Sequence, residues 1–128
     1  MTLIICLDDF NGYQFCERRQ SADREVRRKI LSLADRIRCD SYTASQFEES
    51  DRKKLCIGDD YLNTVNGTCF AERNIPAETG WKKLIVFRWN RRYPSTAFFS
   101  FPAGMKKVSE EHFTGYSHEK ITMETYVR

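Results

Sequence analysis

The chain has 128 residues, of which 41% are hydrophobic and 30% are charged, and its formal net charge is +3. This length suits one domain, and the apolar content is enough for a packed core, so a disordered chain is excluded. The small positive charge permits a phosphate-bearing partner but does not demand one, because acidic and basic residues are interspersed.

The chain opens with an apolar, β-branched run at Thr2–Leu7, which is typical of a strand buried on both faces. The run is too short to cross a membrane, lacks a basic segment before it and is followed by Asp8-Asp9. We therefore expect a cytosolic protein with no signal peptide. Asn11-Gly12 indicates a turn, and the segment Tyr13–Gln20 is expected to be irregular.

An amphipathic helix is predicted next, capped by Ser21 and ending near Arg36. Its apolar positions recur at helical spacing: Val26, Ile30, Leu33, Ala34 and Ile37. Ile37–Asp40 is expected to be a short strand, and Ser41–Ser50 a second helix. Asp51–Gly58 is predicted to be a loop with an extended piece at Leu55–Ile57.

The second half of the chain is predicted to be mainly strands. We expect them at Thr68–Ala71, Trp81–Asn90, Thr96–Phe101 and Ile121–Val127. Met105–Val108 is expected to be extended, with a short turn at Ser109–Glu111. The order predicts a single α/β domain over residues 1–128, with a mixed central sheet that is parallel in its early strands and antiparallel at its C-terminal edge.

The five cysteines show no metal-ligand spacing, and only two histidines, His112 and His118, are present. We expect free thiols, with Cys6 and Cys69 in the core, and neither a metal site nor a bound cofactor. Carboxylates that hold Mg²⁺ leave little trace in a sequence, so that alternative stays open.

A first candidate site is Arg18-Arg19-Gln20-Ser21 with Asp23, where two guanidinium groups, an amide and a hydroxyl meet a helix start. Such a set can bind an anion or a nucleotide. The alternative is a capped surface helix with solvated arginines.

A second candidate is the alternation of aromatic and basic residues in Trp89, Arg91, Arg92 and Tyr93, which suits stacking on a base in a nucleic acid. We favour the alternative, in which Trp89 lies in the core and both arginines lie in solvent.

The third candidate, Ser117-His118-Glu119-Lys120, could serve acid–base chemistry. An exposed strand start is favoured there, because neighbouring side chains in a strand point to opposite faces. The sequence shows no pattern of a Ser-His-Asp triad.

The run Leu3–Leu7, the Asn11-Gly12 turn and Asp23 near the start of the next helix resemble the first strand, loop and helix of dihydrofolate reductases. Ser41–Phe47 lies where that family has its next turn and helix, and the last strands follow the family's C-terminal order. The resemblance implies a dihydrofolate-reductase-like three-layer core. It also implies a pocket near Arg19, Asp23 and Ser41, with Asp23 hydrogen-bonded to an aminopyrimidine edge.

The sequence departs from that family where the nicotinamide cofactor would bind. Cys69-Phe70-Ala71-Glu72-Arg73 stands at the expected glycine pair, and the side chains there would block the close approach that a pyrophosphate needs. The chain is also short in the region of the adenine half. These departures imply a protein that lacks the NADPH site and is not a reductase.

The sequence also resembles small bacterial proteins that carry a ribonuclease Z label. The shared segments are Phe15-x-x-Arg18-Arg19-Gln20-Ser21-x-Asp23, Phe87-x-Trp89-Asn90-Arg91-x-Tyr93-Pro94 and Ser117–Thr122. The His-x-His-x-Asp-His metal motif of true ribonuclease Z is absent, so its mechanism does not transfer.

Taken together, these observations predict a small bacterial cytosolic protein that binds a nucleotide-like or pterin-like ligand without reducing it. The expected ligand-binding residues are Arg18, Arg19, Gln20, Ser21, Asp23 and Ser41. One alternative is an RNA-processing nuclease. Another is a protein-interaction module of phage or defence origin that uses Phe98, Phe99 and Phe101. The ligand, the oligomeric state and whether any reaction is catalysed stay open.

Overall fold

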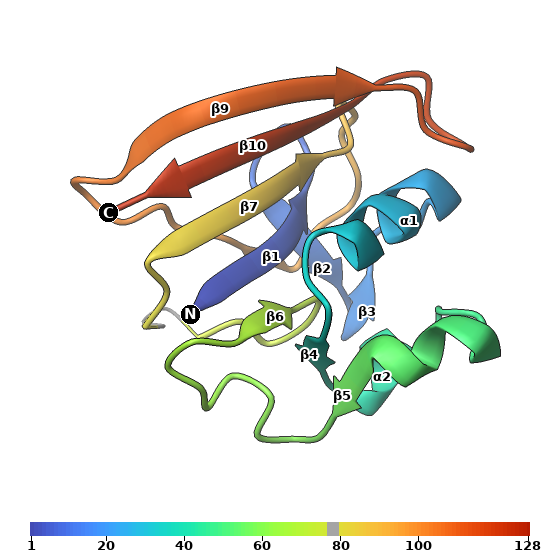
Figure 1. Cartoon of the computed structure of the whole chain (residues 1–128). Helices are drawn as coiled ribbons and strands as arrows, with labels where there is room; N and C mark the ends of the chain where they lie inside the picture. The colour runs from blue at the N-terminus through green and yellow to red at the C-terminus, as the bar shows by residue number, and fades with distance from the viewer. Residues whose placement is uncertain (77–79) are drawn as a thin grey trace.

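The computed structural model describes residues 1–76 and 80–128, which form two sheets and three short helices (Figure 1). Seven strands make the central sheet in the order β5-β4-β6-β1-β7-β10-β9. Their bounds are β1 (Thr2–Leu7), β4 (Ile37–Cys39), β5 (Leu55–Ile57), β6 (Thr68–Phe70), β7 (Lys83–Arg88), β9 (Lys106–Phe113) and β10 (Ile121–Val127).

The second sheet has three strands in the order β3-β2-β8, with β2 at Gly12–Phe15, β3 at Arg18–Arg19 and β8 at Ala97–Phe98. The helices are α1 (Arg24–Ser32), α2 (Ser41–Ala44) and the 3₁₀ helix η1 (Glu49–Lys54). In the central sheet β1 pairs in parallel with β6 and β7, while β10 pairs antiparallel with β7 and β9. The predicted mixed α/β sheet is therefore confirmed.

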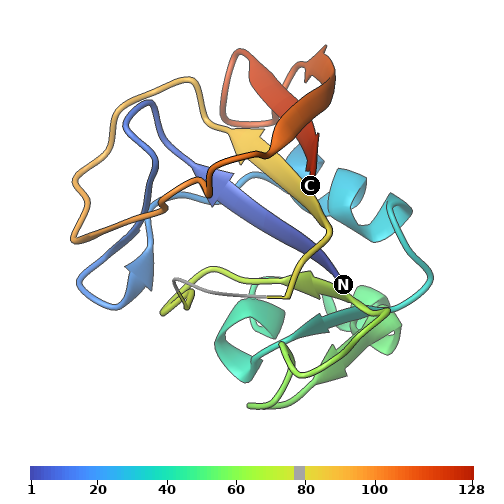
Figure 2. The ribbon, with the colours of Figure 1, turned by 90° about the vertical axis from the view of Figure 1, so that its left-hand side faces the viewer.

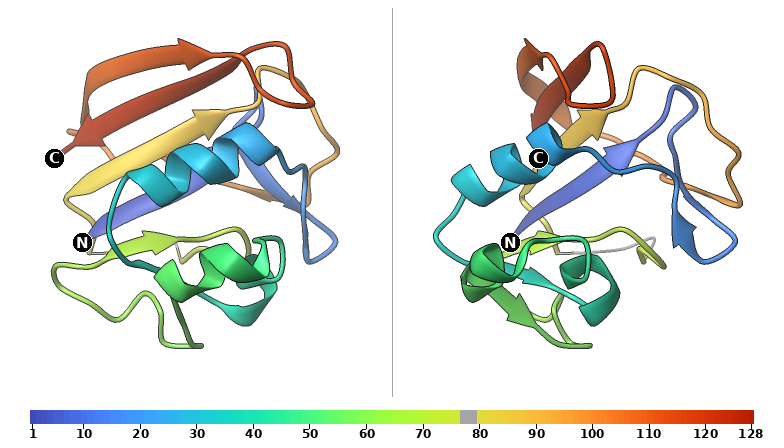
Figure 3. Two further views of the ribbon diagram at one scale, coloured as in Figure 1. Left: turned by 45° about the vertical axis from the view of Figure 1, so that its right-hand side comes forward. Right: turned by 90° about the vertical axis from the view of Figure 1, so that its right-hand side faces the viewer.

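The central sheet buries both of its faces, because residues of β1 alternate between two hydrophobic clusters. Leu3, Ile5 and Leu7 face one cluster, which also contains Tyr13 of β2 and Phe99 directly after β8 in the small sheet. On the opposite face Ile4 packs with residues of α1 and of the segment after α2. The sheet thus lies between a helical layer and the small sheet, as Figure 2 and the right-hand view in Figure 3 show.

Helix α1 differs from its predicted bounds at both ends. Its N-cap is Asp23, whose carboxylate accepts hydrogen bonds from the backbone of Glu25 and Val26, so the predicted cap at Ser21 is wrong. Aspartate and serine are equally good N-caps, so the sequence alone does not decide between Asp23 and Ser21. In the structure the loop at Tyr116 and Ser117 donates hydrogen bonds to Asp23. The helix ends at Ser32 rather than near Arg36, because the chain must turn there to enter β4.

The segment expected to be irregular at Tyr13–Gln20 is instead the β2–β3 hairpin. Its turn is built on Cys16 and Glu17, whose φ angles are 49° and 65°. Positive φ at both central positions is the mark of a type I′ two-residue loop, in which glycine or asparagine is usual. This turn has neither residue, so its sequence gives no warning of the hairpin.

Two other predicted elements also have different bounds. The helix expected over Ser41–Ser50 is divided into α2 and η1. The turn expected at Ser109–Glu111 lies inside β9, an exposed edge strand that pairs with β10. Nearly all of its residues are solvated, so it lacks the apolar alternation that reveals a half-buried strand.

All five cysteines lie in the described ranges and are free thiols, with Cys39 and Cys69 fully buried. Burial raises the pKa of the Cys39 thiol to about 12. Among the helices of residues 1–76 and 80–128, none has the length and apolarity to cross a membrane.

Candidate functional site

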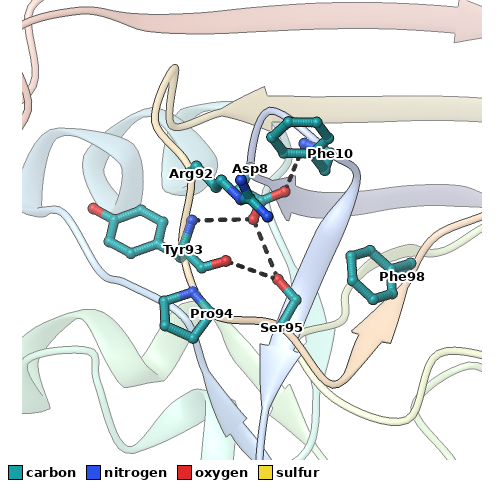
Figure 4. Close-up of a pocket in the computed structure, with 7 residues that line it drawn as sticks. All are labelled: Asp8, Phe10, Arg92, Tyr93, Pro94, Ser95 and Phe98. Atoms are coloured by element: carbon teal, nitrogen blue, oxygen red, sulfur yellow. Dashed lines mark hydrogen bonds between the residues drawn. The ribbon is translucent and has the colours of Figure 1, made fainter.

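Asp8, at the end of β1, is a buried carboxylate that joins two loops. Its Oδ1 accepts hydrogen bonds from the backbone N–H groups of Phe10 and Gly12, both at 2.8 Å. Its Oδ2 accepts from the backbone N–H of Tyr93 and from Ser95 Oγ, both at 3.2 Å (Figure 4). Burial acts to raise the pKa of Asp8, but these hydrogen bonds outweigh it and hold the pKa below its usual value. The carboxylate therefore fixes residues 8–12 against residues 92–95.

An open cavity of about 650 Å³ lies on this frame. Its lining residues are Asp8, Phe10, Arg92, Tyr93, Pro94, Ser95 and Phe98 (Figure 4). The phenyl rings belong to side chains that are 59% exposed at Phe10 and 57% exposed at Phe98. The Arg92 guanidinium lies 4.7 Å from the centroid of the Phe10 ring. We name this cavity the Phe10–Phe98 pocket.

The residues predicted to bind a ligand at the start of α1 are largely engaged by protein partners. Arg19 Nε lies 3.0 and 3.1 Å from the two carboxylate oxygens of Glu72, and Arg19 Nη2 donates to the Tyr42 carbonyl at 3.0 Å. Gln20 Nε2 donates to Ser95 Oγ and to Asp8. Arg18 and Ser41 are exposed, and no ion pair involves either within the described part of the chain.

Asp23 is fully buried as a side chain and is occupied by donors from a distant loop. It accepts hydrogen bonds from the backbone N–H of Tyr116 at 3.0 Å and of Ser117 at 2.9 Å, and lies 2.9 Å from His118 Nδ1. Burial acts to raise its pKa, but these hydrogen bonds and that from Glu25 prevail and hold the pKa well below its usual range. The cavity nearby, between Arg19, Ser21 and Trp89, measures only about 10 Å³, which is room for one water.

His118 corrects the interpretation of Ser117–Lys120 as an exposed strand start. The segment is a loop before β10, and the His118 side chain is only 5% exposed. The imidazole stacks on Trp89 with ring centroids 4.7 Å apart, and its Nε2 lies 2.9 Å from Tyr93 Oη. Asp23 and Trp89 thus hold this loop from two sides.

In the second candidate cluster, Trp89 and the two arginines have the separate environments that we favoured from the sequence. Trp89 is 4% exposed and belongs to the core, whereas Arg91 and Arg92 are exposed. The expected aromatic interaction surface is smaller than predicted, because Phe99 is buried and packs edge-on against Phe101. Of that set only Phe98 is strongly exposed, and it lines the Phe10–Phe98 pocket.

The sequence did not reveal that Phe10 and Asp8 line a pocket, nor that His118 is buried against Asp23 and Trp89. A phenylalanine inside the polar turn Asp8–Gly12 was an available signal, since such turns rarely carry a large apolar side chain without a partner. Within residues 1–76 and 80–128, no three His, Cys, Asp or Glu side chains lie close enough to hold a metal ion.

Gly115 allows the His118 loop to close on Asp23. A Cβ at Gly115 would lie 2.7 Å from Asp23 Oδ2 and 2.8 Å from the His118 carbonyl oxygen. We expect Gly115→Ala to lower the free energy of unfolding by about 2 kcal/mol, because neither neighbour can retreat. Urea denaturation measures the loss. The control is Gly80→Ala, where a Cβ meets nothing within 4 Å; an equal loss in both variants would contradict the expected crowding.

Comparison with known proteins shows the fold. No protein-family model matches the sequence, and no curated protein matches it. Among solved structures, the chain is similar to dihydrofolate reductase from Enterococcus faecalis, in a complex with NADP(H) and RAB-propyl. The TM-score is 0.64 at 10% sequence identity, and the match covers 99% of this chain and 95% of that one. The comparisons do not show the ribonuclease Z resemblance. The chain therefore has a dihydrofolate-reductase-like fold.

Proposed function

We propose that this protein binds a nucleotide-like ligand in the Phe10–Phe98 pocket and does not act as a reductase. The observation that carries the proposal is the convergence of two exposed phenyl rings and one exposed guanidinium on a cavity of about 650 Å³. Exposed aromatic side chains that cluster around a concavity are typical of binding sites, and the volume lies in the usual range for small ligands.

The lining residues suit the two chemical parts of a nucleotide. Phe10 and Phe98 offer aromatic faces on which a planar base can stack, a contact of about 1–3 kcal/mol per base. Arg92 offers a guanidinium that can pair with a phosphate through two hydrogen bonds. The Asp8 carboxylate cannot serve the ligand, because it already accepts bonds from both loops.

The same bonds favour binding by keeping the pocket in shape before the ligand arrives. Asp8 holds the turn that carries Phe10 and the loop that carries Arg92, while β2 pairs Gly12 with Phe98. Affinity improves when little side-chain and loop freedom remains to be lost on binding. Gly12 is essential to this closure, since a Cβ there would overlap Ser95 Oγ.

The environment of Asp23 and Arg19 argues against reductase chemistry and against a pterin at the start of α1. The Asp23 oxygens already face six hydrogen-bonding atoms of the protein, and the adjacent space of about 10 Å³ holds no heterocycle. Glu72 and Arg73 stand where the reductase resemblance implies a glycine pair, and Glu72 is buried against Arg19. We therefore propose that the NADPH site is absent. From the sequence we also propose that the protein works in the cytosol.

Titration with AMP, GMP, CMP, UMP, folic acid and NADPH, followed by calorimetry, tests the proposal. We expect at least one mononucleotide to bind, and Phe98→Ala and Arg92→Ala each to weaken it about tenfold, the effect of about 1.4 kcal/mol. Phe15→Ala and Arg91→Ala are matched controls, because both side chains are exposed outside the pocket. Absence of binding by every mononucleotide, or equal loss in the controls, would refute this function. A single-stranded hexanucleotide arm tests the RNA alternative, which predicts tighter binding than by any mononucleotide.

A further inference from the structure

Ser21, His118 and Asp23 form a hydrogen-bonded chain that the proposed pocket does not use. His118 Nδ1 lies 2.9 Å from Asp23 Oδ2, and His118 Nε2 lies 3.2 Å from Ser21 Oγ. The histidine and the aspartate are 95 residues apart in sequence, which is why no sequence motif reveals the arrangement. Both are almost fully buried, whereas Ser21 is partly exposed.

The environment of Asp23 fixes the role of each imidazole nitrogen. Hydrogen bonds from two backbone N–H groups of the loop keep Asp23 ionised, so its oxygens can only accept. His118 Nδ1 must then carry the hydrogen that points to Asp23. In the neutral imidazole His118 Nε2 then has the lone pair, which can accept the hydroxyl proton of Ser21. This is the division of roles that makes a histidine a general base for a serine.

We propose that Ser21 is a nucleophile that accepts a small acyl group from an ester, with His118 as its general base and Asp23 as the group that orients His118. Ser21 Oγ attacks the ester carbonyl carbon and forms an Oγ–C bond, while its proton passes to His118 Nε2. The ester C–O bond breaks, and the leaving alcohol takes that proton. Water, deprotonated by His118, then releases the carboxylic acid and restores Ser21.

The surroundings of Ser21 limit the size of the acyl group. The cavity that Ser21 lines together with Gln20 and Trp89 measures about 10 Å³, which admits no more than a methyl-sized group. The larger part of a substrate must therefore stay on the solvent side. The ester class that fits is an acetyl ester with a solvated leaving group.

Tyr93 competes with Ser21 for the same nitrogen. Its hydroxyl oxygen lies 2.9 Å from His118 Nε2, closer than Ser21 Oγ. One lone pair cannot accept fully from two hydroxyl groups at once. Removing the Tyr93 hydroxyl is therefore expected to increase the reactivity of Ser21, a gain of function that a merely structural hydrogen-bond network would not produce.

The test combines a fluorophosphonate probe, whose adduct is located by mass spectrometry, with hydrolysis of p-nitrophenyl acetate. We expect one adduct, on Ser21, which Ser21→Ala abolishes; His118→Gln slows labelling on the order of 100-fold. Tyr93→Phe is expected to speed both reactions severalfold. Ser45→Ala is the control, an exposed serine that donates to the Tyr42 carbonyl and contacts no histidine.

Circular dichroism melting shows which variants are folded. Ser21→Ala removes only the hydroxyl of a partly exposed side chain, and Tyr93→Phe keeps the aromatic ring. These two variants therefore decide the outcome even if His118→Gln unfolds. Absence of any adduct on the folded wild-type protein would overturn the proposal, as would labelling that persists in Ser21→Ala. Tyr93→Phe without an increase in rate would overturn it too. Because the probe carries no nucleobase, failure here would leave the nucleotide proposal standing, and the reverse also holds.

Discussion

Replacing Asp23 with asparagine is expected to lower the free energy of unfolding at pH 7 by about 3 kcal/mol. Tyr116 donates its backbone N–H to Oδ1 and Ser117 donates to Oδ2, and the asparagine amide nitrogen, which replaces one of these two oxygens, cannot accept the hydrogen bond made there. It also removes the negative charge that faces His118 Nδ1. One substitution thereby weakens the cap of α1 and the attachment of the loop before β10.

The pH dependence identifies the carboxylate as the cause. The folded-state pKa of Asp23 is depressed below its unfolded value of about 3.9, so its contribution is complete above that value. The contribution is lost as the pH falls through the folded pKa. Wild-type stability should therefore decline below about pH 4, and the decline should be shallower in Asp23→Asn. Urea denaturation at pH 7, 4 and 3 measures this, with the exposed Asp9→Asn as control. Parallel pH curves for wild type and Asp23→Asn would contradict it.

The strands that bury both faces could be predicted from sequence, because their apolar side chains are a local signal. Thr2–Leu7 and Ile121–Val127 lie at the predicted positions. Strand β9 could not be predicted with the same means: almost all its residues are solvated, and only its pairing with β10 makes it a strand. The β2–β3 hairpin was missed because Cys16 and Glu17 adopt positive φ without glycine.

The candidate site shows a different limit. The sequence singled out the residues at the start of α1 as a meeting place of polar groups, but it could not say what those groups meet. Asp23 finds its partners more than 90 residues away, and Arg19 finds Glu72 53 residues away. The Phe10–Phe98 pocket is likewise made by two turns and strand β8, which only the fold brings together. Sequence locates reactive side chains, and tertiary pairing decides which of them remain available.

Arg19→Ala is expected to lower the free energy of unfolding at pH 7 by about 4 kcal/mol, because it leaves the buried Glu72 carboxylate without its cation. Burial already raises the pKa of Glu72, and the Arg19 guanidinium only partly offsets this. Arg19 also stacks on the Tyr42 ring at 4.2 Å, so its loss loosens the contact between β3 and α2. Arg18→Ala is the matched control, since Arg18 is the exposed neighbour in the same strand.

The stability that depends on Glu72 changes with pH in the opposite direction to the stability that Asp23 contributes. Without Arg19 the folded-state pKa of Glu72 rises further above its unfolded value of about 4.3, so the penalty appears only as the pH rises through that value. The deficit of Arg19→Ala should thus shrink between pH 7 and pH 4. Adding Glu72→Gln should recover part of it at pH 7, because a neutral amide needs no cation. Urea denaturation of the single and double variants measures both effects. A deficit that is independent of pH and unchanged by Glu72→Gln would mean that packing on Tyr42, rather than the ion pair, stabilises this part of the molecule.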